Sequence, residues 1–235
     1  RDLARVLKNR YQDIKIDTLI NENATRSEFV KWESTLANLS VDDIVFFSFC
    51  GHGVLDDSLN WFFGTHTMDF KNPNQAGISY DDLMQVIGSC PSRKKIVTLD
   101  ACHSGEIDVD QKKLVRLEKN GEVVSYARGA KVISQDSKGY DSYTLMKELF
   151  ADFGSVNGTV VISASGGMEF AYENEQYKNG VFTFSMIETL ESEIWNTLKV
   201  SNLQSEVIRK VESRTNGMQK PTVRAGVLNY DWVIW

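Results

Sequence analysis

Three short and almost wholly apolar segments constrain the fold of this chain more than any other feature. They are "DIVFFSFC" (43–50), "KKIVTLDA" (94–101) and "GTVVISASG" (158–166). An apolar run of this length, bounded by charge or glycine, is typical of a β-strand that is buried on both faces. Other parts of the chain must cover those two faces. The sequence therefore predicts a sheet in the interior of the protein.

Segments with helical spacing of apolar residues separate and follow these strands. Alternation of strands and helices predicts a mainly parallel sheet with helices on both sides. The expected fold class is therefore α/β, as a three-layer α/β/α sandwich. The apolar positions that mark the helices are Leu3, Val6 and Leu7; Phe29, Trp32, Leu36 and Leu39; Leu83 and Ile87; Ile187, Leu190, Ile194 and Leu198; and Leu203, Val207, Ile208 and Val211.

Local signals set the ends of several elements. Thr25 and Glu28 have the spacing of a capping box, which satisfies backbone N–H groups at a helix start. Ser79 and Asp82 open another helix in the same way. Further extended segments are expected at 13–20, at 59–65 and around Thr222 and Val223, and a helix end is expected at Asn216-Gly217.

The regular pattern breaks between Glu106 and about Gly139. Residues 111–138 carry seven Lys or Arg against three Asp or Glu and show no sustained period. We expect 106–139 to be a basic surface insertion or linker with room for a hairpin. The whole chain, 1–235, is expected to form a single domain around it.

The composition excludes several classes of function. A net charge of −6 gives no long-range attraction to nucleic acid or to anionic membranes. No apolar run is long enough to span a bilayer, and no signal peptide is visible. The cysteines, Cys50, Cys90 and Cys102, lack the spacing of a disulfide framework, which favours a reducing compartment. The sequence favours a cytoplasmic protein that binds neither nucleic acid nor membranes.

Two of the predicted strands end in reactive residues. One leads into "FCGHGV", which places His52 between glycines, and another leads into "DACHSG", which places Cys102 before a turn. Ligands meet side chains at the carboxyl ends of strands in such sheets. A thiol attacks as the thiolate and needs a base, so His52 is the candidate base for Cys102. The N–H groups of Gly53 and Cys102 are candidates for an oxyanion hole.

These two blocks resemble the caspase-like cysteine peptidases, in particular the branch of metacaspases, paracaspases and bacterial caspase homologues. The quoted segments are "FFSFCGHG" and "VTLDACHSG", and His52 precedes Cys102 by 50 positions, close to the spacing of caspases. The segment "VVISASGGMEFAYENEQYKNGVFTFSMIETL" (160–190) is also similar to that branch. The resemblance implies a cysteine endopeptidase that uses a Cys-His dyad on protein or peptide substrates.

The resemblance also addresses specificity. Caspases that cleave after aspartate carry Gln two residues before the nucleophile, whereas this chain has Asp100 there. A carboxylate beside the P1 side chain attracts Arg or Lys and repels Asp. Glu169 matches an acidic pocket residue of paracaspases, although a solvated loop charge is an equal alternative. Cys50 either lines the same pocket or packs in the core.

Other expectations follow from the family. Its first strand and a third acidic pocket residue would lie upstream of Arg1, and a fused domain or regulatory partner is expected there. Basic residues of the insertion are candidate sites of self-cleavage. No cofactor is expected for the chemistry, although metacaspases often respond to calcium, and the residues considered for that ion are Asp69, Asp81, Asp82 and Asp108.

Three alternative functions can be weighed against the sequence. The chain could be a catalytically silent scaffold or interaction domain with the same fold. A nucleotide-binding domain lacks support, because no G-x-G-x-x-G or Walker motif follows a strand. A zinc site at Cys50, His52, Cys102 and His103 would lack the short-knuckle spacing of structural zinc sites.

Overall fold

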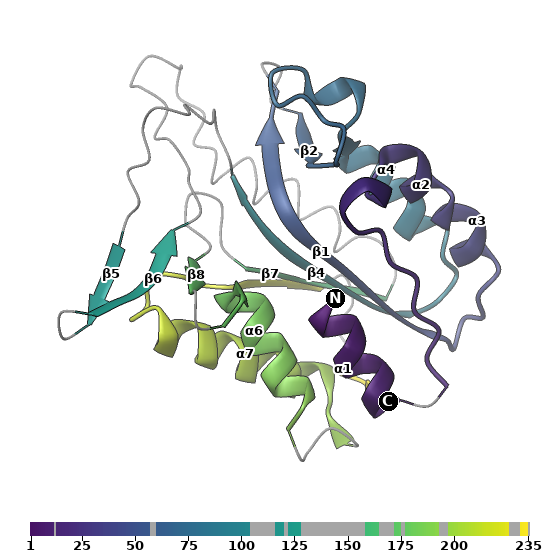
Figure 1. Ribbon diagram of the computed structural model, residues 1–235. Helices are drawn as coiled ribbons and strands as arrows, with labels where there is room; N and C mark the ends of the chain where they lie inside the picture. The colour runs from purple at the N-terminus through teal and green to yellow at the C-terminus, as the bar shows by residue number, and fades with distance from the viewer. Residues whose placement is uncertain are drawn as a thin grey trace.

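The computed structural model in Figure 1 describes most of the chain. The described residues are 1–11, 13–56, 60–103, 116–119, 122–127, 158–164, 172–174, 177–192, 197–225 and 231–234. At Leu55, Cys102 and His103, and in 116–119, 122–127 and 172–174, the description covers the backbone alone.

The main sheet of the described chain is mixed, with its long strands parallel at the centre. The strand order is β10-β7-β4-β1-β2-β3. The pairs β7–β4 and β4–β1 are parallel, and the pairs toward both edges are antiparallel. The strand bounds are β1 (Ile44–Leu55), β2 (Trp61–Phe63), β3 (Ile78–Ser79), β4 (Lys94–His103), β7 (Thr159–Ser163) and β10 (Thr222–Ala225).

Helices cover the two faces of this sheet (Figure 1). One layer holds α1 (Asp2–Arg10), α6 (Val181–Leu190) and α7 (Val200–Arg214); the other holds α2 (Arg26–Val30), α3 (Trp32–Ala37) and α4 (Tyr80–Gly88). Short 3-10 turns occur at η1 (Asn21–Asn23) and η2 (Pro73–Gln75). The predicted α/β/α sandwich is confirmed.

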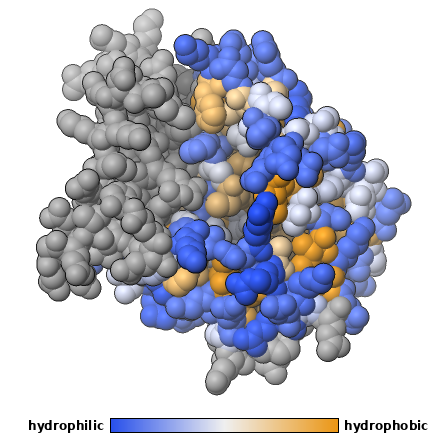
Figure 2. All heavy atoms as spheres, viewed as in Figure 1, coloured by the Kyte–Doolittle hydropathy of each residue, from blue (hydrophilic) through white to orange (hydrophobic). Residues whose placement is uncertain are grey.

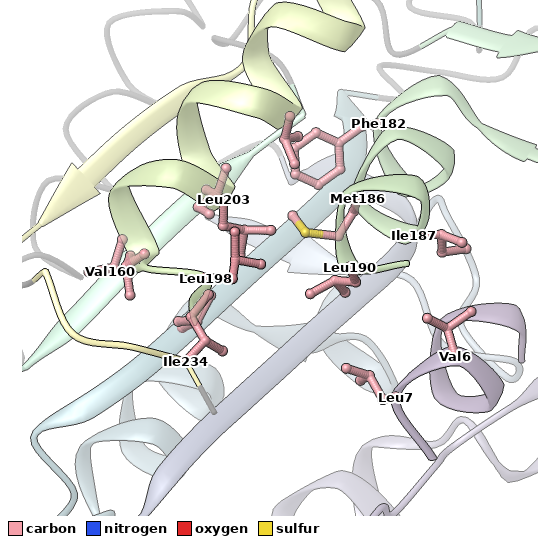
Figure 3. Packing of buried hydrophobic residues seen from close by; sticks show 14 of the residues in the cluster. Val6, Leu7, Val160, Phe182, Met186, Ile187, Leu190, Leu198, Leu203 and Ile234 are labelled. Carbon is pink, nitrogen blue, oxygen red and sulfur yellow. The ribbon is translucent and has the colours of Figure 1, made fainter. Parts of the chain in front are cut away.

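Strand alternation explains why the central strands carry apolar residues at consecutive positions. In β4, Ile96 joins the core beneath α6 and α7, whereas its neighbour Val97 joins the core beneath α4, and both side chains are fully buried. Figure 3 shows the first core, where Phe182, Met186 and Leu190 of α6 lie against residues from the sheet and from α7. Burying one such side chain contributes about 1.5–3 kcal/mol.

Helix starts follow the predicted signals. Ser79 and Asp82 form a complete capping box at α4, in which each side chain accepts a hydrogen bond from the other residue's backbone N–H. At α2, the Thr25 hydroxyl accepts from the backbone N–H of Glu28. The helical stripe after Thr25 divides into α2 and α3, which meet at Lys31.

Two predicted elements differ in the structure. Residues 13–20 form no strand, and no strand among the described residues pairs with them. Ile14 and Ile16 instead pack against the first core and Leu19 against the second. The helix predicted from Ile187 onward is α6, which begins at Val181 and ends at Leu190. Leu198 is buried outside it.

One edge of β1 is only partly paired. β2 pairs with Gly53–Leu55, at the carboxyl end of the strand. Along Ile44–His52, the side of β1 that faces away from β4 pairs with no strand among the described residues. This edge is adjacent to the reactive end of the sheet.

The basic insertion contributes to a second, smaller sheet. Its hairpin joins β5 (Arg116–Lys119) to β6 (Glu122–Ala127), followed in the sheet by β8 (Tyr172–Asn174) and β9 (Asn179–Gly180). β9 leads directly into α6. The second sheet is thereby connected to the start of the helix that lies nearest the candidate site.

The surface fits a folded domain with an interior core. On the face in Figure 2, hydrophilic residues predominate over the coloured part and apolar ones form small separate patches. Within the described ranges, no helix combines the length and the hydropathy needed to cross a bilayer.

Candidate active site

The register of β1 against β4 brings the predicted dyad positions together. The two strands pair in parallel from Ile44↔Lys94 onward, so that His52 is the partner of Cys102. Neighbouring strands lie about 4.8 Å apart, which places these two backbone positions side by side at the carboxyl ends of the strands. The same register pairs Cys50 with Asp100.

His52 is exposed and held at its backbone. Its carbonyl accepts a hydrogen bond of 2.7 Å from the amide of Gly64, just after β2. Its ring meets the ring of Phe70 edge to face, with centroids 5.8 Å apart. The imidazole is therefore accessible, with an aromatic wall on one side.

Gly53 is fixed by the indole of Trp61. A Cβ atom at position 53 would lie 1.9 Å from Cζ2 of that buried ring, so only glycine fits. Antiparallel strands turn the N–H and C=O of alternate residues to the same neighbour. Because the His52 carbonyl is bonded toward β2, the amide of Gly53 is directed toward β4, the strand of Cys102.

Asp100 is buried at the start of α6. Its carboxylate is only 2% exposed. Oδ2 accepts a hydrogen bond of 3.2 Å from the backbone N–H of Thr183 and a second, short one from the Thr183 hydroxyl. Anions are favoured at a helix N-terminus, so this helix supports the ionised carboxylate. No motif in the sequence marks Thr183 as part of the site.

Cys50 lies beside this carboxylate. Its sulfur is 4.0 Å from Oδ2 of Asp100 and 3.9 Å from the hydroxyl oxygen of Thr183. Cys50 is exposed and Thr183 is partly exposed, whereas Asp100 is buried. The exposed thiol and the threonine therefore flank the buried carboxylate at the solvent side.

Of the remaining candidate residues, the structure describes Asp69, Asp81 and Asp82 but not two others. Glu169 and Asp108 lie outside the described residues. Asp69 binds the amides of Lys71 and Asn72, which lower its pKa. Among the side chains that the structure describes, no three His, Cys, Asp or Glu group as a metal site.

Asp82 has a structural partner. Burial would raise the pKa of this carboxyl, but hydrogen bonds from Arg26 and Ser79 keep it lowered. The Arg26 guanidinium lies 2.9 Å from it. Asp82 thus serves the capping of α4 and its contact with α2.

Comparison with known proteins identifies the family of the chain. Residues 1–229 match the family described as "Caspase domain", Peptidase_C14. Among solved structures, the chain is similar to a Geobacter sulfurreducens protein whose crystal structure was determined as a structural genomics target. The two share 16% identity and a TM-score of 0.61, over 97% of this chain and 83% of that chain.

The structural likeness, at this low identity, shows a shared fold. No curated protein matches the sequence. The family match, in contrast, covers nearly the whole chain and includes both reactive strand ends. The chain therefore belongs to the caspase domain family of cysteine peptidases.

Proposed function

We propose that the protein is a cysteine endopeptidase that cleaves protein substrates after Arg or Lys. Cys102 is the nucleophile, and His52 is the general base and then the general acid. The observation that carries this proposal is the pairing of positions 52 and 102 on adjacent parallel strands in a member of a peptidase family.

The proposed reaction needs only these groups and water. His52 takes the thiol proton, and the Cys102 sulfur forms a bond to the scissile carbonyl carbon. The carbonyl oxygen becomes an oxyanion, which the amides of Gly53 and Cys102 stabilise. His52 then gives its proton to the leaving amine as the C–N bond breaks. Water hydrolyses the resulting thioester, which restores the thiol and releases the acid.

Asp100 supports specificity for a basic P1 residue. Asp100 is buried and lies two positions before Cys102 on β4, and positions two apart along a strand share one face of the sheet. A guanidinium or ammonium group is favoured beside such a carboxylate, and an aspartate is disfavoured. Cys50 lines the approach, and we propose Glu169 as a second acidic residue of the same pocket.

A scan of P1 residues tests this function. Short fluorogenic peptides that differ only at P1 (Arg, Lys, Asp, Leu) are offered to the wild-type protein and to Cys102→Ala, with and without calcium. We expect cleavage after Arg and Lys, loss of it in the variant, and no dependence of the chemistry on the metal. Cleavage after Asp or Leu in preference to Arg would remove the proposed specificity.

The insertion supports a further proposal of self-processing. Arg116 and Lys119 lie within β5, whose backbone is paired with β6. A protease binds its substrate as an extended, unpaired segment. We therefore expect the peptide bonds after Arg116 and Lys119 to be protected from cleavage. Cleavage is expected at basic residues outside the described strands, namely Lys112, Lys113, Arg128, Lys131 and Lys138.

The self-processing proposal is tested by incubating wild-type protein beside Cys102→Ala, and by adding a trace of wild type to that variant. We expect fragments in the first and third samples, with ends at the residues named above. Identical intact bands in all samples would remove the idea.

A second candidate function is a silent scaffold with the same fold. The low exposure of Asp100 favours it, since the carboxylate then serves only to cap α6. The two candidates differ in the reactivity of Cys102: an enzyme reacts there with an Arg-based probe, and a scaffold does not.

A further inference from the structure

The start of α6 carries no side-chain cap of its own. Its N-cap residue is Gly180, which makes no side-chain hydrogen bond. The first four N–H groups of a helix lack acceptors within the helix. Asp100 accepts from one of them, that of Thr183, across 83 positions of sequence. A strand residue therefore completes this helix.

Thr183 contributes two separate groups to the same carboxylate oxygen. The backbone N–H belongs to the helix and would be present with any residue at this position. The hydroxyl is the property of the side chain, and it also donates to Oδ2 of Asp100. Capping of the helix requires only the N–H, so the hydroxyl acts on the carboxylate beyond what the helix needs.

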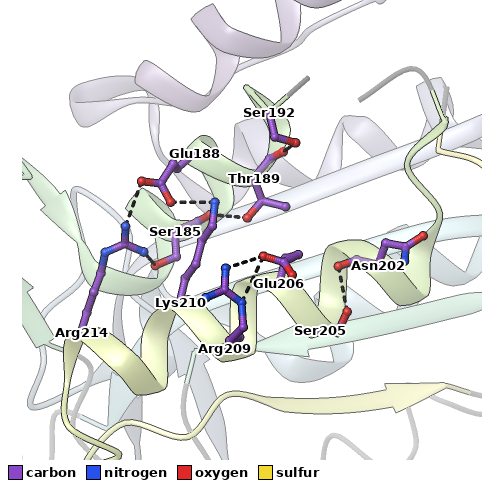
Figure 4. A network of polar contacts seen from close by, with 10 residues as sticks. All are labelled: Ser185, Glu188, Thr189, Ser192, Asn202, Ser205, Glu206, Arg209, Lys210 and Arg214. Atoms are coloured by element: carbon purple, nitrogen blue, oxygen red, sulfur yellow. Dashed lines mark hydrogen bonds and ion pairs between the residues drawn. The ribbon is translucent and has the colours of Figure 1, made fainter. Parts of the chain in front are cut away.

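The position of Thr183 is fixed by the packing of α6 on α7. Glu188 of α6 lies 2.6 Å from Nζ of Lys210 and 2.9 Å from Arg214, both on α7. Arg214 also donates to the Ser185 hydroxyl at 3.0 Å. Figure 4 shows these contacts joining the facing sides of the two helices. The first turn of α6 thus belongs to a helix that is held against α7 by these contacts.

We propose that Thr183 is a positioning residue for Asp100 in the recognition of the P1 side chain. Its hydroxyl and amide hold Oδ2, which fixes the plane of the carboxylate and favours the ionised form that a P1 cation requires. The Cys50 sulfur lies 4.0 Å from the same oxygen and 3.9 Å from the Thr183 hydroxyl, so all three groups meet at one side of the carboxylate. This inference rests on the proposed function of the dyad and of Asp100.

The test compares Thr183→Val with Thr183→Ser. Valine keeps the size of the side chain and the backbone N–H but removes the hydroxyl, whereas serine keeps the hydroxyl. We expect Thr183→Val to lower kcat/KM for P1 Arg peptides by about tenfold or more, mainly through KM, because a hydrogen bond to a charged group is lost. The acid limb of its pH–activity profile should also have its midpoint at a higher pH than that of wild type.

Serine is expected to restore both properties, and the thermal midpoint of each variant shows whether α6 remains folded. Three results would overturn the proposal. Thr183→Val could match wild type within twofold in kcat/KM, its acid limb could be unmoved, or Thr183→Ser could be as impaired as valine in a folded protein.

The outcome separates this inference from the function on which it rests. If wild type cleaves after Arg and Thr183→Val does so equally well, only the role of Thr183 fails. If wild type cleaves no peptide and takes no Arg-based probe at Cys102, the proposed function fails and the role of Thr183 fails with it.

Discussion

His52 and Cys102 are register partners on β1 and β4, at the end of the longest parallel pairing in the sheet. β4 is buried on both faces, whereas β1 is only half-buried and packs Phe46 against one core and Phe47 against the other, so the full burial expected for 43–50 is not found. A slip of one residue would move each of these core side chains to the opposite face. The cost of such a slip keeps the two positions in register. The core of the sandwich thereby fixes the relative placement of the proposed dyad.

Asp100 is expected to serve both specificity and stability. Asp100→Asn keeps an oxygen that can accept from Thr183 but removes the charge. We expect the ratio of kcat/KM for P1 Arg to that for P1 Leu to fall by at least tenfold, with little change in Tm. Asp100→Ala should lose the ratio and also destabilise the fold by about 1–2 kcal/mol, since the α6 cap is lost. An unchanged ratio in Asp100→Asn would mean that the residue is only a cap.

Gly53→Ala is expected to destabilise the fold strongly. The added Cβ would lie 1.9 Å from the buried ring of Trp61, and relief requires a shift of β1 or of the indole. Overpacking of this kind costs about 1–3 kcal/mol. Denaturant unfolding measures the loss.

Gly88→Ala is the matched control for that variant. Gly88 is the last residue of α4, and a Cβ there meets nothing within 4 Å. Alanine is favoured over glycine in a helix by about 0.5–1 kcal/mol, so this variant should be as stable as wild type or more so. Equal losses at both positions would contradict the close contact between Gly53 and Trp61.

Cys50 is expected to control access to Asp100. Its sulfur lies 4.0 Å from the carboxylate on the exposed side. Cys50→Leu should reduce cleavage after Arg by more than tenfold through its added bulk, whereas Cys50→Ser should retain most of it. Labelling of Cys102 with iodoacetamide should persist in both. Full activity in the leucine variant would remove Cys50 from the substrate path.

Glu188 makes the contribution of the α6–α7 contact to folding stability depend on pH. Burial would raise the pKa of this carboxyl, but hydrogen bonds from Lys210 and Arg214 hold it below its usual value. A lowered pKa means that the contribution to stability is present above the unfolded value of about 4.3 and is lost as pH falls through the folded value. Glu188→Gln should cost about 1 kcal/mol at pH 7.

The unfolding free energies of wild type and Glu188→Gln should converge in acid. Glu206→Gln serves as the control, because Glu206 forms its ion pair with Arg209 of its own helix in an exposed contact. Glu206→Gln should lower the unfolding free energy at pH 7 by less than Glu188→Gln does. A constant difference between wild type and Glu188→Gln from neutral to acid pH would contradict the assigned contacts.

The sequence was informative where local chemistry decides the structure. Apolar runs bounded by charge or glycine predicted β1, β4 and β7, and the Ser79 signal predicted α4. Because β1 and β4 are parallel neighbours, their ends meet, as the two reactive motifs required.

Long-range contacts were not readable in the same way. Residues 13–20 alternate like a strand, but a strand needs a partner, and none in the part of the chain that the structure describes pairs with them. The start of α6 lacks a cap in its own sequence, so the contact between Thr183 and Asp100 could not be inferred from local pattern. The unfilled cap at Gly180 was the one available signal that a distant acceptor was needed.

We propose that the thiol at position 102 is activated by His52 and presented to a basic P1 residue. The most direct measurement is mass-spectrometric mapping of an arginyl chloromethyl ketone on wild type, His52→Ala and Asp100→Asn, with an aspartyl ketone as the comparison. We expect stoichiometric modification of Cys102 by the arginyl reagent in wild type, and much slower modification in both variants and with the aspartyl reagent. Modification of Cys50 in place of Cys102, or equal rates in wild type and His52→Ala, would contradict it.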